Sequence, residues 1–535
     1  MGLQKGKEAE VRLTGYNLSP APMVVKGQPS QQDERSVILR PETPSGRAFN
    51  EIALALGEAP EVLSSGENVS LDTAQPVTLP VTVNGRVEAA ENTFRFRAKK
   101  GEKIVLTVNA RRLGSRLDSV LEVVDVKGNP IERGVVRCML ETSTTLRDHD
   151  SVQAGIRIQS PTGFAVDDYV MIGSEILQVD AMPRTPDDDF RFVSFGGRRV
   201  AYFDTTPEAH ANDSPVYKVQ IHPPGAQFAS NGLPLVRLYH RNDDGGPGYG
   251  KDSRLRFVAP ADGEYIARLR DVRGFKGGLN GDDLRYRLAI RQPQPDFQLS
   301  VNPRNPNVPV GGRIPIAVTA LRMDEFEGPI EITVEDLPAG LEATKGVIGP
   351  GQISTTLLLT AREDAKLERA VPLTVMGRAK AGSRQLVHAA SLDDKLKLIS
   401  LMPKPDIFMN AGMKEVELTP GGTVEVQVAI ERNNGFGGRV PVEVLNLPPG
   451  VRVLDVGLNG VLINEDEQQR SFVLEALPTA PPIEQPIVVA GRVETRAGGQ
   501  QTSFAGLPIK LKVKPKVELA AGSKPSPAER PSATK

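Results

Sequence analysis

The chain has 535 residues, and 65 Lys and Arg against 66 Asp and Glu give a formal net charge of −1. With 51 Gly, 44 Pro, no Trp and 39% hydrophobic residues, it is rich in turns yet apolar enough to form cores. No stretch approaches the roughly 18 apolar residues of a membrane-spanning helix, and no basic run suits nucleic acid. These figures exclude a coiled coil, a membrane protein and a wholly disordered chain; the length predicts about three to five domains.

The single cysteine, Cys138, has no partner for an internal disulfide. Such a sequence fits either a reducing cytoplasm or a secreted bacterial protein whose stability comes from β-sheet cores. The first residues carry no apolar core of the signal-peptide kind and open directly into a strand pattern at residues 9–15. The pattern is as compatible with a chain that lacks its natural beginning as with a complete one.

Residues 1–60 are the first predicted unit, a partial β segment. Gly15, Tyr16, Asn17 and Leu18 are similar to the Gly-x-Asn-Leu end of an immunoglobulin-like strand of the IPT type. We therefore expect a partial immunoglobulin-like fold here.

Residues 61–137 and 241–293 carry the next strands. Residues 93–98 and 104–108 alternate apolar and polar side chains around a turn, and residues 284–290 end the block in the same way. Period-2 alternation is typical of strands with one buried face.

Four short patterns stand out in this block: Phe-x-Phe-x-Ala-x-x-Gly, Ser-x-Leu-Asp-x-x-Leu, Asn-Asp-Asp and Gly-x-Tyr. They comprise, in that order, Phe94, Phe96, Ala98 and Gly101; Ser115, Leu117, Asp118 and Leu121; Asn242, Asp243 and Asp244; and Gly263 and Tyr265. Together they resemble the bacterial pre-peptidase C-terminal (PPC) domain. The resemblance implies a jelly-roll β-sandwich, of the kind found beside secreted proteases and in large surface proteins.

Residues 138–240 separate the second and third patterns, which lie close together in the usual family member. This stretch has strand patterns of its own at residues 169–179, 199–203 and 216–222. We interpret it as a small β domain inserted into a loop, where insertions are best tolerated. The whole arrangement resembles secreted or surface proteins of planctomycete-type bacteria.

The last part of the chain is an internal repeat, residues 294–402 and 403–515. Branched residues alternate with period 2 in both copies, and the length of each copy is typical of one sandwich. We therefore predict two tandem immunoglobulin-like sandwiches, followed by a disordered tail at residues 516–535 that is rich in Pro, Ser, Ala and Lys. Four segments return 110 positions later: 295–297 at 405–407, 311–312 at 421–422, 326–330 at 436–440 and 337–341 at 447–451.

The acidic residues of the PPC-like block are a candidate calcium site. Calcium takes six to eight oxygen ligands, and Asp243 and Asp244 offer two carboxylates on a loop that should approach Asp118. The resemblance adds the segment that enters the domain, where some relatives bind calcium and where Glu67 and Asn68 stand here. The alternative, which the sequence favours, is that these acids cap turns by accepting backbone N–H bonds. No other cofactor is indicated.

No catalytic pattern stands out. The chain has no HExxH, CxxC, GxSxG or phosphate-loop signature, and its five histidines are scattered. Cys138 is predicted to be a partly buried strand residue, and the acids at 187–189 and 282–283 to be solvated loop tips. The absence of Trp weakens the case for sugar stacking but leaves Tyr202 and Tyr249 as candidates.

The sequence therefore predicts a multidomain all-β protein that is not an enzyme. It would act as a secreted, cell-surface or periplasmic array of structural, adhesive or binding modules, facing an extracellular protein or a polysaccharide surface. Two alternatives remain open: the accessory region of a larger secreted hydrolase or peptidase, and a carbohydrate-binding module. The ligand and the oligomeric state do not follow from the sequence.

Overall fold

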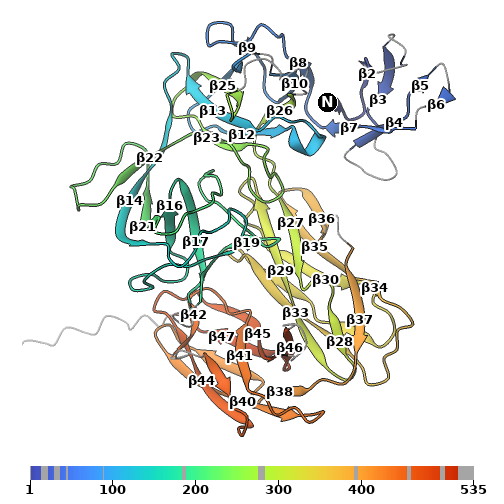
Figure 1. Cartoon of the computed structure of the whole chain (residues 1–535), viewed down its shortest axis with the longest axis vertical. Helices are drawn as coiled ribbons and strands as arrows, with labels where there is room; N and C mark the ends of the chain where they lie inside the picture. The colour runs from blue at the N-terminus through green and yellow to red at the C-terminus, as the bar shows by residue number, and fades with distance from the viewer. Residues whose placement is uncertain are drawn as a thin grey trace, which may run out of the picture.

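The molecule is built from β-strands in successive sheets along the chain (Figure 1), which confirms the predicted multidomain all-β class. Among the residues described, the helical content is one 3-10 turn, η1 (Arg111–Leu113). The tail from residue 516, the pair 282–283, residue 187 and residues 15–17 lie outside the described residues. The computed structural model describes residues 2–13, 18, 22–28, 36–43, 46–47, 49–87, 89–183, 188–274, 284–390, 396–454, 460–494 and 501–515.

The N-terminal unit is a small set of sheets around Leu3, Val25, Val37, Leu39 and Leu54. Its first and last strands lie side by side and run parallel. The three-stranded sheet is ordered β1 (Gly2–Gln4), β7 (Ile52–Gly57), β4 (Ser36–Leu39); two hairpins pair β2 (Glu8–Val11) with β3 (Met23–Lys26) and β5 (Glu42–Thr43) with β6 (Gly46–Arg47).

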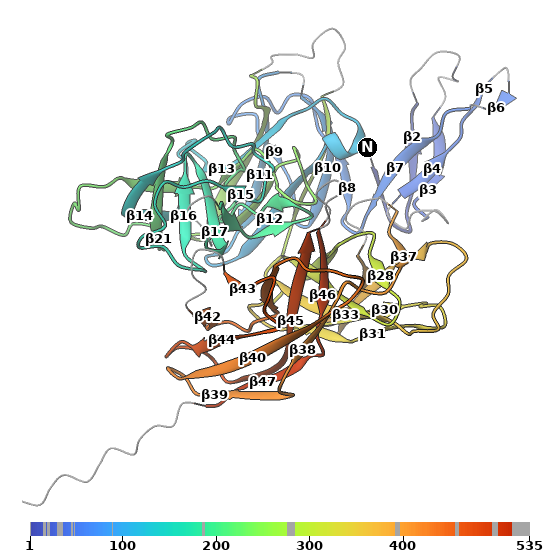
Figure 2. The same cartoon turned by 60° about the horizontal axis from the view of Figure 1, so that its bottom comes forward.

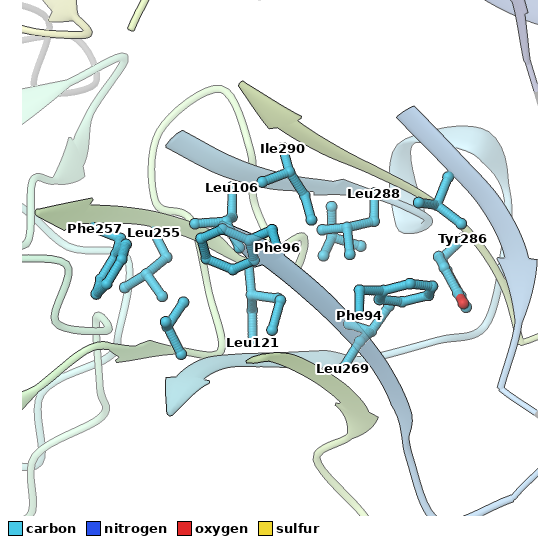
Figure 3. Packing of buried hydrophobic residues seen from close by; sticks show 14 of the residues in the cluster. Phe94, Phe96, Leu106, Leu121, Leu255, Phe257, Leu269, Tyr286, Leu288 and Ile290 are labelled. Atoms are coloured by element: carbon cyan, nitrogen blue, oxygen red, sulfur yellow. The ribbon is translucent and has the colours of Figure 1, made fainter. Parts of the chain in front are cut away.

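The next unit is a sandwich whose strands come from two distant parts of the chain. Two five-stranded sheets pack face to face on one apolar core (Figure 3). One sheet is ordered β24 (Arg254–Val258), β12 (Lys103–Asn109), β26 (Arg285–Arg291), β10 (Val81–Arg86), β8 (Glu61–Leu63). The other is ordered β23 (Arg241–Asn242), β13 (Ser119–Asp125), β25 (Gly263–Asp271), β11 (Asn92–Ala98), β9 (Gln75–Pro76). We call this unit the split sandwich.

The residues of the four PPC-like patterns build this core and its turns. Phe94 and Phe96 point inward from β11, and Phe96 lies 6.0 Å from the Phe257 ring in an edge-on contact. Tyr265 packs beside them, and its hydroxyl donates to the Ala261 carbonyl at 2.6 Å. The patterns therefore encode packing and turn geometry, which is why they can be seen in the sequence.

Between β13 and β23 the chain leaves the split sandwich and forms the inserted sheet. The sheet has apolar clusters on both faces. Its first strand, β14, begins at Glu132 and so crosses the expected boundary at residue 138. The order is β15 (Gly155–Ile156), β18 (Phe190–Phe192), β17 (Glu175–Ala181), β16 (Tyr169–Ile172), β21 (Pro215–His222), β14 (Glu132–Ser143), β22 (Leu235–Tyr239); β19 (Ser194–Phe195) pairs with β20 (Arg198–Arg199).

The first immunoglobulin-like sandwich follows β26 directly. Its buried side chains alternate along each strand, as in β27 and β29, so that one face of each sheet enters the core. Its sheets are ordered β27 (Asp296–Asn302), β29 (Arg313–Met323), β33 (Ser354–Ala361), β31 (Leu341–Ala343); then β32 (Gly346–Ile348), β30 (Ile330–Glu335), β35 (Thr374–Ala381), β36 (Arg384–Ala389); and β28 (Asn307–Pro309), β37 (Leu398–Met402), β34 (Val371–Pro372).

The second immunoglobulin-like sandwich repeats this topology around its own core. The sheet β27-β29-β33-β31 corresponds strand for strand to β38-β40-β44-β42, and the pair β28-β37 corresponds to β39-β47. Its sheets are ordered β38 (Ile407–Ala411), β40 (Thr423–Arg432), β44 (Gln469–Ala476), β42 (Val451–Leu454), and β39 (Glu415–Leu418), β47 (Ile509–Val513), β45 (Ile483–Glu494), β41 (Val440–Leu445), β43 (Val461–Ile463), with β46 (Gln501–Ala505) on β45.

The two immunoglobulin-like sandwiches pack against each other beyond their short connection. Leu358 of the first meets Val488 and Ala505 of the second in a small apolar cluster. Beside it, the Gln352 amide donates to the Gln485 side chain at 2.7 Å. Figures 1 and 2 both show the pair in contact along one side.

Candidate functional site

The five residues of the predicted calcium site lie at two places. Asn68 is buried beside β11, where its amide donates to the Thr93 carbonyl at 3.1 Å. Asp243 and Asp244 follow β23, at the far edge of the same sheet. Strands β25 and β13 lie between β11 and β23, which are therefore roughly 14 Å apart at ordinary strand spacing. Glu67, next to Asn68, is exposed.

Asp118, Asp243 and Asp244 do lie near one another, but two of the three carboxylates have protein partners. The Lys251 ammonium donates to Asp244 at 2.9 Å, and the Thr206 hydroxyl donates to Asp243. Burial raises the pKa of Asp244, Lys251 opposes this, and the charges of Asp243 and Asp118 add to the rise. The Lys251 ammonium thus already supplies the positive charge that a metal ion would bring to Asp244.

The predicted calcium site is therefore not assembled by the structure. Over the described part of the chain, no three His, Cys, Asp or Glu side chains are placed to hold a metal ion. The reason lies in the pairing of the sheet, which puts β9 and β23 on opposite edges. Asn68 instead bonds to the Thr93 carbonyl and to the Ser64 hydroxyl.

The structure concentrates charge where three units meet, and Asp204 is the first such residue. Its carboxylate, 6% exposed, accepts from Arg256 of β24 at 3.0 Å and lies 3.2 Å from Arg133 of β14. Although burial opposes ionisation, Arg256 and Arg133 hold the pKa of Asp204 below its usual range. This carboxylate ties the inserted sheet to the split sandwich.

Asp324 plays the same part between the split sandwich and the first immunoglobulin-like sandwich. It is 2% exposed, and it accepts from Arg254 at 2.5 Å and from Arg291 at 2.6 Å. The backbone N–H of Gln294 donates to it as well, at 2.9 Å. Burial opposes ionisation here too, but the arginines and this N–H lower the pKa of Asp324.

Tyr249 lies between these two clusters. The guanidinium carbon of Arg112 is 5.0 Å from its ring centroid and that of Arg254 is 5.3 Å away. Its hydroxyl is 3.6 Å from the sulfur of Met323, in the neighbouring sandwich. Cation–π contacts of this kind stabilise a desolvated arginine, so Tyr249 helps to close the junction.

These residues border a cleft of about 400 Å³ between the three units. The inserted sheet contributes a largely apolar wall with Phe195 and Tyr202, and the first immunoglobulin-like sandwich contributes Leu321 and Met323 opposite. Ion pairs around Asp324 form the polar part of the lining. Both tyrosines that the sequence left as candidates for sugar contact therefore reach the same cleft.

A further buried cluster holds the inserted sheet together. Arg199, fully buried, donates through Nε and Nη2 to Glu175 at 3.2 and 3.0 Å, and through Nη1 and Nη2 to three backbone carbonyls. His210 lies 2.6 Å from the same carboxylate. Because every partner belongs to the inserted sheet or its loops, the cluster is a structural one.

The single cysteine is poorly suited to catalysis. Cys138 is buried on β14, and burial raises the pKa of its thiol to about 11, with a smaller contribution from Glu141. Since the thiolate is the reactive form, this side chain stays a weak nucleophile. His388 is bonded to Asp296 and His240 to a backbone carbonyl, so both have structural partners.

The sequence did not single out Asp204, Asp324 or Glu175. Each acid stands in a loop or strand, and its arginine partners lie elsewhere in the chain, up to 71 positions away in the pair Arg133 and Asp204. Asp324 stands in a turn with a left-handed φ of 50°. Burial and pairing across units were not readable from local patterns.

No protein-family model matches the sequence, and no curated protein does. Solved structures match over parts of the chain. Domains 4 and 5 of the S-layer protein SbsC give a TM-score of 0.14 at 12% identity, covering 27% of this chain and 66% of that one. A Porphyromonas gingivalis protein of unknown function gives 0.15 at 12% identity (40% and 99% covered), and fibronectin(III)-like modules of Clostridium thermocellum CbhA give 0.13 at 9% (42% and 100%). Similarity at this level identifies no family.

Within the described ranges, no helix has the length and apolar character needed to cross a membrane.

Proposed function

We propose that this chain is a non-catalytic scaffold of β-sandwiches that acts outside the cell or at its surface, holding binding or adhesive loops in one arrangement. The observation that carries the proposal is the buried ion pairing of Asp324 with Arg254 and Arg291. A carboxylate buried at a junction and shared by two arginines of the neighbouring unit opposes separation, because opening would leave buried charges unpaired. Asp204 of the inserted sheet is likewise buried and paired with Arg256 of the split sandwich, and an apolar cluster joins the last two sandwiches.

We propose further that the split sandwich is of the PPC type and that its partner is an extracellular protein or a polysaccharide surface. The core positions of Phe94, Phe96, Leu121 and Tyr265 support the first part, since they are the positions that define the resemblance. The accessory region of a larger secreted hydrolase or peptidase is the alternative. It shares this architecture and differs only in what the chain is attached to.

A carbohydrate-binding role is a second candidate because Tyr202 and Tyr249 both line the junction cleft. The arginines beside Tyr249 occupy much of its ring surface, which leaves Tyr202 as the ring that a sugar would contact. Binding of soluble glycans that is lost in Tyr202→Ala would favour this role over a purely structural one.

Small-angle X-ray scattering of the full chain tests the scaffold. We expect one fixed arrangement to fit the curve, and we expect Asp324→Asn to raise the radius of gyration, because breaking a buried ion pair costs roughly 3 kcal/mol. Glu325→Gln is the matched control, since Glu325 is the adjacent, exposed partner of Lys103 and such pairs contribute less than about 1 kcal/mol. An unmodified chain that needs an ensemble of open arrangements would refute the scaffold.

An immunoblot of fractionated source cells tests the location. A band in the envelope or the medium is expected, and its mass relative to 57.7 kDa shows whether the chain works as part of a larger protein. A band confined to the cytosol would contradict the extracellular proposal while leaving the scaffold intact.

A further inference from the structure

The two immunoglobulin-like sandwiches share a strand pairing that suits them to mechanical load. Near its start, the second sandwich has β39, which lies parallel to the last strand β47, with Glu415 opposite Lys510 and Leu418 opposite Val513. In the first sandwich β28 lies parallel to the last strand β37 in the same way, with Asn307 opposite Ser400. Figure 2 shows β39 and β47 side by side, and Figure 1 shows β28 beside β37.

Parallel pairing determines how tension reaches these hydrogen bonds. The chain comes to β39 at one end of the pair and leaves β47 at the opposite end, so a pull on the chain acts along both strands. The backbone N–H of Lys510 donates to the Lys414 carbonyl at 2.9 Å, and that of Lys514 donates to the Leu418 carbonyl at 2.8 Å. Bonds that lie across the pull carry the load together and must break together.

Side chains strengthen the same pair in the second sandwich. Glu417 of β39 lies 3.8 Å from Lys512 and 2.5 Å from Lys514, on the partner strand and just beyond it. On the other face, Val416 and Leu511 are buried in the core. Sliding β39 along β47 would therefore break backbone bonds, ion pairs and apolar contacts in one step.

The split sandwich is built the other way. Its strand β10 has β8 on one side, parallel, with Glu61 opposite Thr82, and the last strand β26 on the other, antiparallel, with Ile290 opposite Val81. The start of β8 and the end of β26 thus lie at the same end of β10. Tension between them pulls across the strands and opens the sheet one bond at a time.

We propose that the two immunoglobulin-like sandwiches are load-bearing units, which resist tension applied between the two ends of the chain, and that the split sandwich yields first. This inference rests on the proposed scaffold role and adds to it the kind of work that the scaffold does. Resistance to force depends on the barrier to unfolding, so the geometry of the loaded pair matters more than the overall stability of a unit.

Single-molecule stretching of the full chain tests this. One handle is attached at Glu58→Cys, an exposed position ahead of the split sandwich, and the other at the end of the chain, in a Cys138→Ala background. We expect the split sandwich to open at low force. Two later steps at higher force should follow, each adding up to roughly 3.5 Å per residue for residues 294–402 and 403–515.

A second attachment provides the matched control without disturbing the fold. Moving the far handle to Glu465→Cys, in an exposed loop, applies the load between the starts of β38 and β44. Ile407 lies opposite Arg432 and Gln469 opposite Ala429, so both starts lie at the same end of β40. The second sandwich should then open at no more than about half that force, since its hydrogen bonds break in turn.

The first sandwich is loaded identically in both attachments and serves as the internal reference. Equal opening forces for the second sandwich in the two geometries would overturn the proposal, as would opening of either immunoglobulin-like sandwich before the split sandwich. These outcomes are distinct from failure of the scaffold, because scattering reports the arrangement of the units and stretching reports the strength of each one.

Discussion

His240 shows how a single residue can make the stability of the junction depend on pH. The ring is 4% exposed, contacts Phe257 edge-on at 5.0 Å between centroids, and places Nδ1 3.1 Å from the Arg256 carbonyl. Burial, with a further contribution from the charge of Arg133, lowers the pKa of His240 to about 4, and Asp204 opposes the shift only in part. In the folded protein the imidazole is therefore neutral at pH values where a free histidine would be charged.

We expect stability to fall as the pH drops from about 6.5 towards 4. The unfolded chain binds a proton at His240 in this range and the folded chain does not, so acid favours unfolding by up to about 3 kcal/mol. Above pH 6.5 the His240 ring is neutral in both the folded and the unfolded chain, so this loss of stability is absent. Urea unfolding at several pH values measures it, and His240→Asn, which keeps a donor for the carbonyl, should flatten the profile over this window. A profile that the substitution leaves unchanged would contradict the assignment.

Lys251 leads to a prediction about metal. Because its ammonium already neutralises Asp244, we expect a chelator to leave the melting temperature of the full chain unchanged. In Lys251→Ala, Asp244 and its acidic neighbours lose their counter-charge at a cost of up to about 1 kcal/mol, and added calcium should recover part of the loss. Lys251→Arg, which keeps the charge, is the control. If a chelator lowered the melting temperature of the unmodified chain, this expectation would be wrong and the metal site predicted from the sequence would be supported.

At the scale of elements, the repeat shows how one turn serves two purposes. Asp324 and Asn434 occupy equivalent positions with φ of 50° and 55°, a conformation that Asp and Asn tolerate better than most residues. Asn434 donates its amide to the Lys404 carbonyl at 2.9 Å, whereas Asp324 accepts from the Gln294 N–H. A carboxylate in place of the amide keeps the turn and provides a negative charge that pairs with the arginines of the split sandwich.

The repeat also contains a pair of arginines that no sequence argument singled out. Arg322 donates to the Gly328 carbonyl at 2.6 Å and Arg432 to the Gly438 carbonyl at 2.5 Å, each with its guanidinium near the Phe ring that the repeat does predict. Each closes the loop after the long second strand of its sandwich. The Phe rings were visible as part of a repeated motif, whereas the arginines lie outside the repeated segments.

Strands were predictable from the sequence to the extent that their burial alternates. The strand β29 buries every second residue over most of its length, and so its pattern and its structure coincide. The sequence could not show whether the predicted acidic residues meet, because the pairing order of a sheet cannot be read from its strands, and that order decides whether Asn68 and Asp243 are neighbours. The candidate cleft was beyond the sequence for the same reason, since its residues come from three units.

At the scale of the whole molecule, the junctions limit how far the units can move relative to one another. Asp204 pairs with Arg256 of the next unit and Asp324 with Arg254 and Arg291 of the next unit, so neither unit can move away without exposing both partners or leaving them unpaired. The last two sandwiches are joined instead by apolar side chains, Leu358 against Val488. A chain joined in these two ways presents its loops at set distances, which distinguishes it from a string of independent domains.

The inserted sheet begins and ends at neighbouring points. Glu132 lies opposite Tyr239, and just outside this pair the His240 N–H donates to the Ile131 carbonyl at 3.2 Å. In the connectivity of the split sandwich, more than a hundred intervening residues thus take the place of a hairpin turn. A short turn that joins Ile131 to His240 would therefore close the split sandwich, and another domain whose two ends lie together would be compatible with the same position.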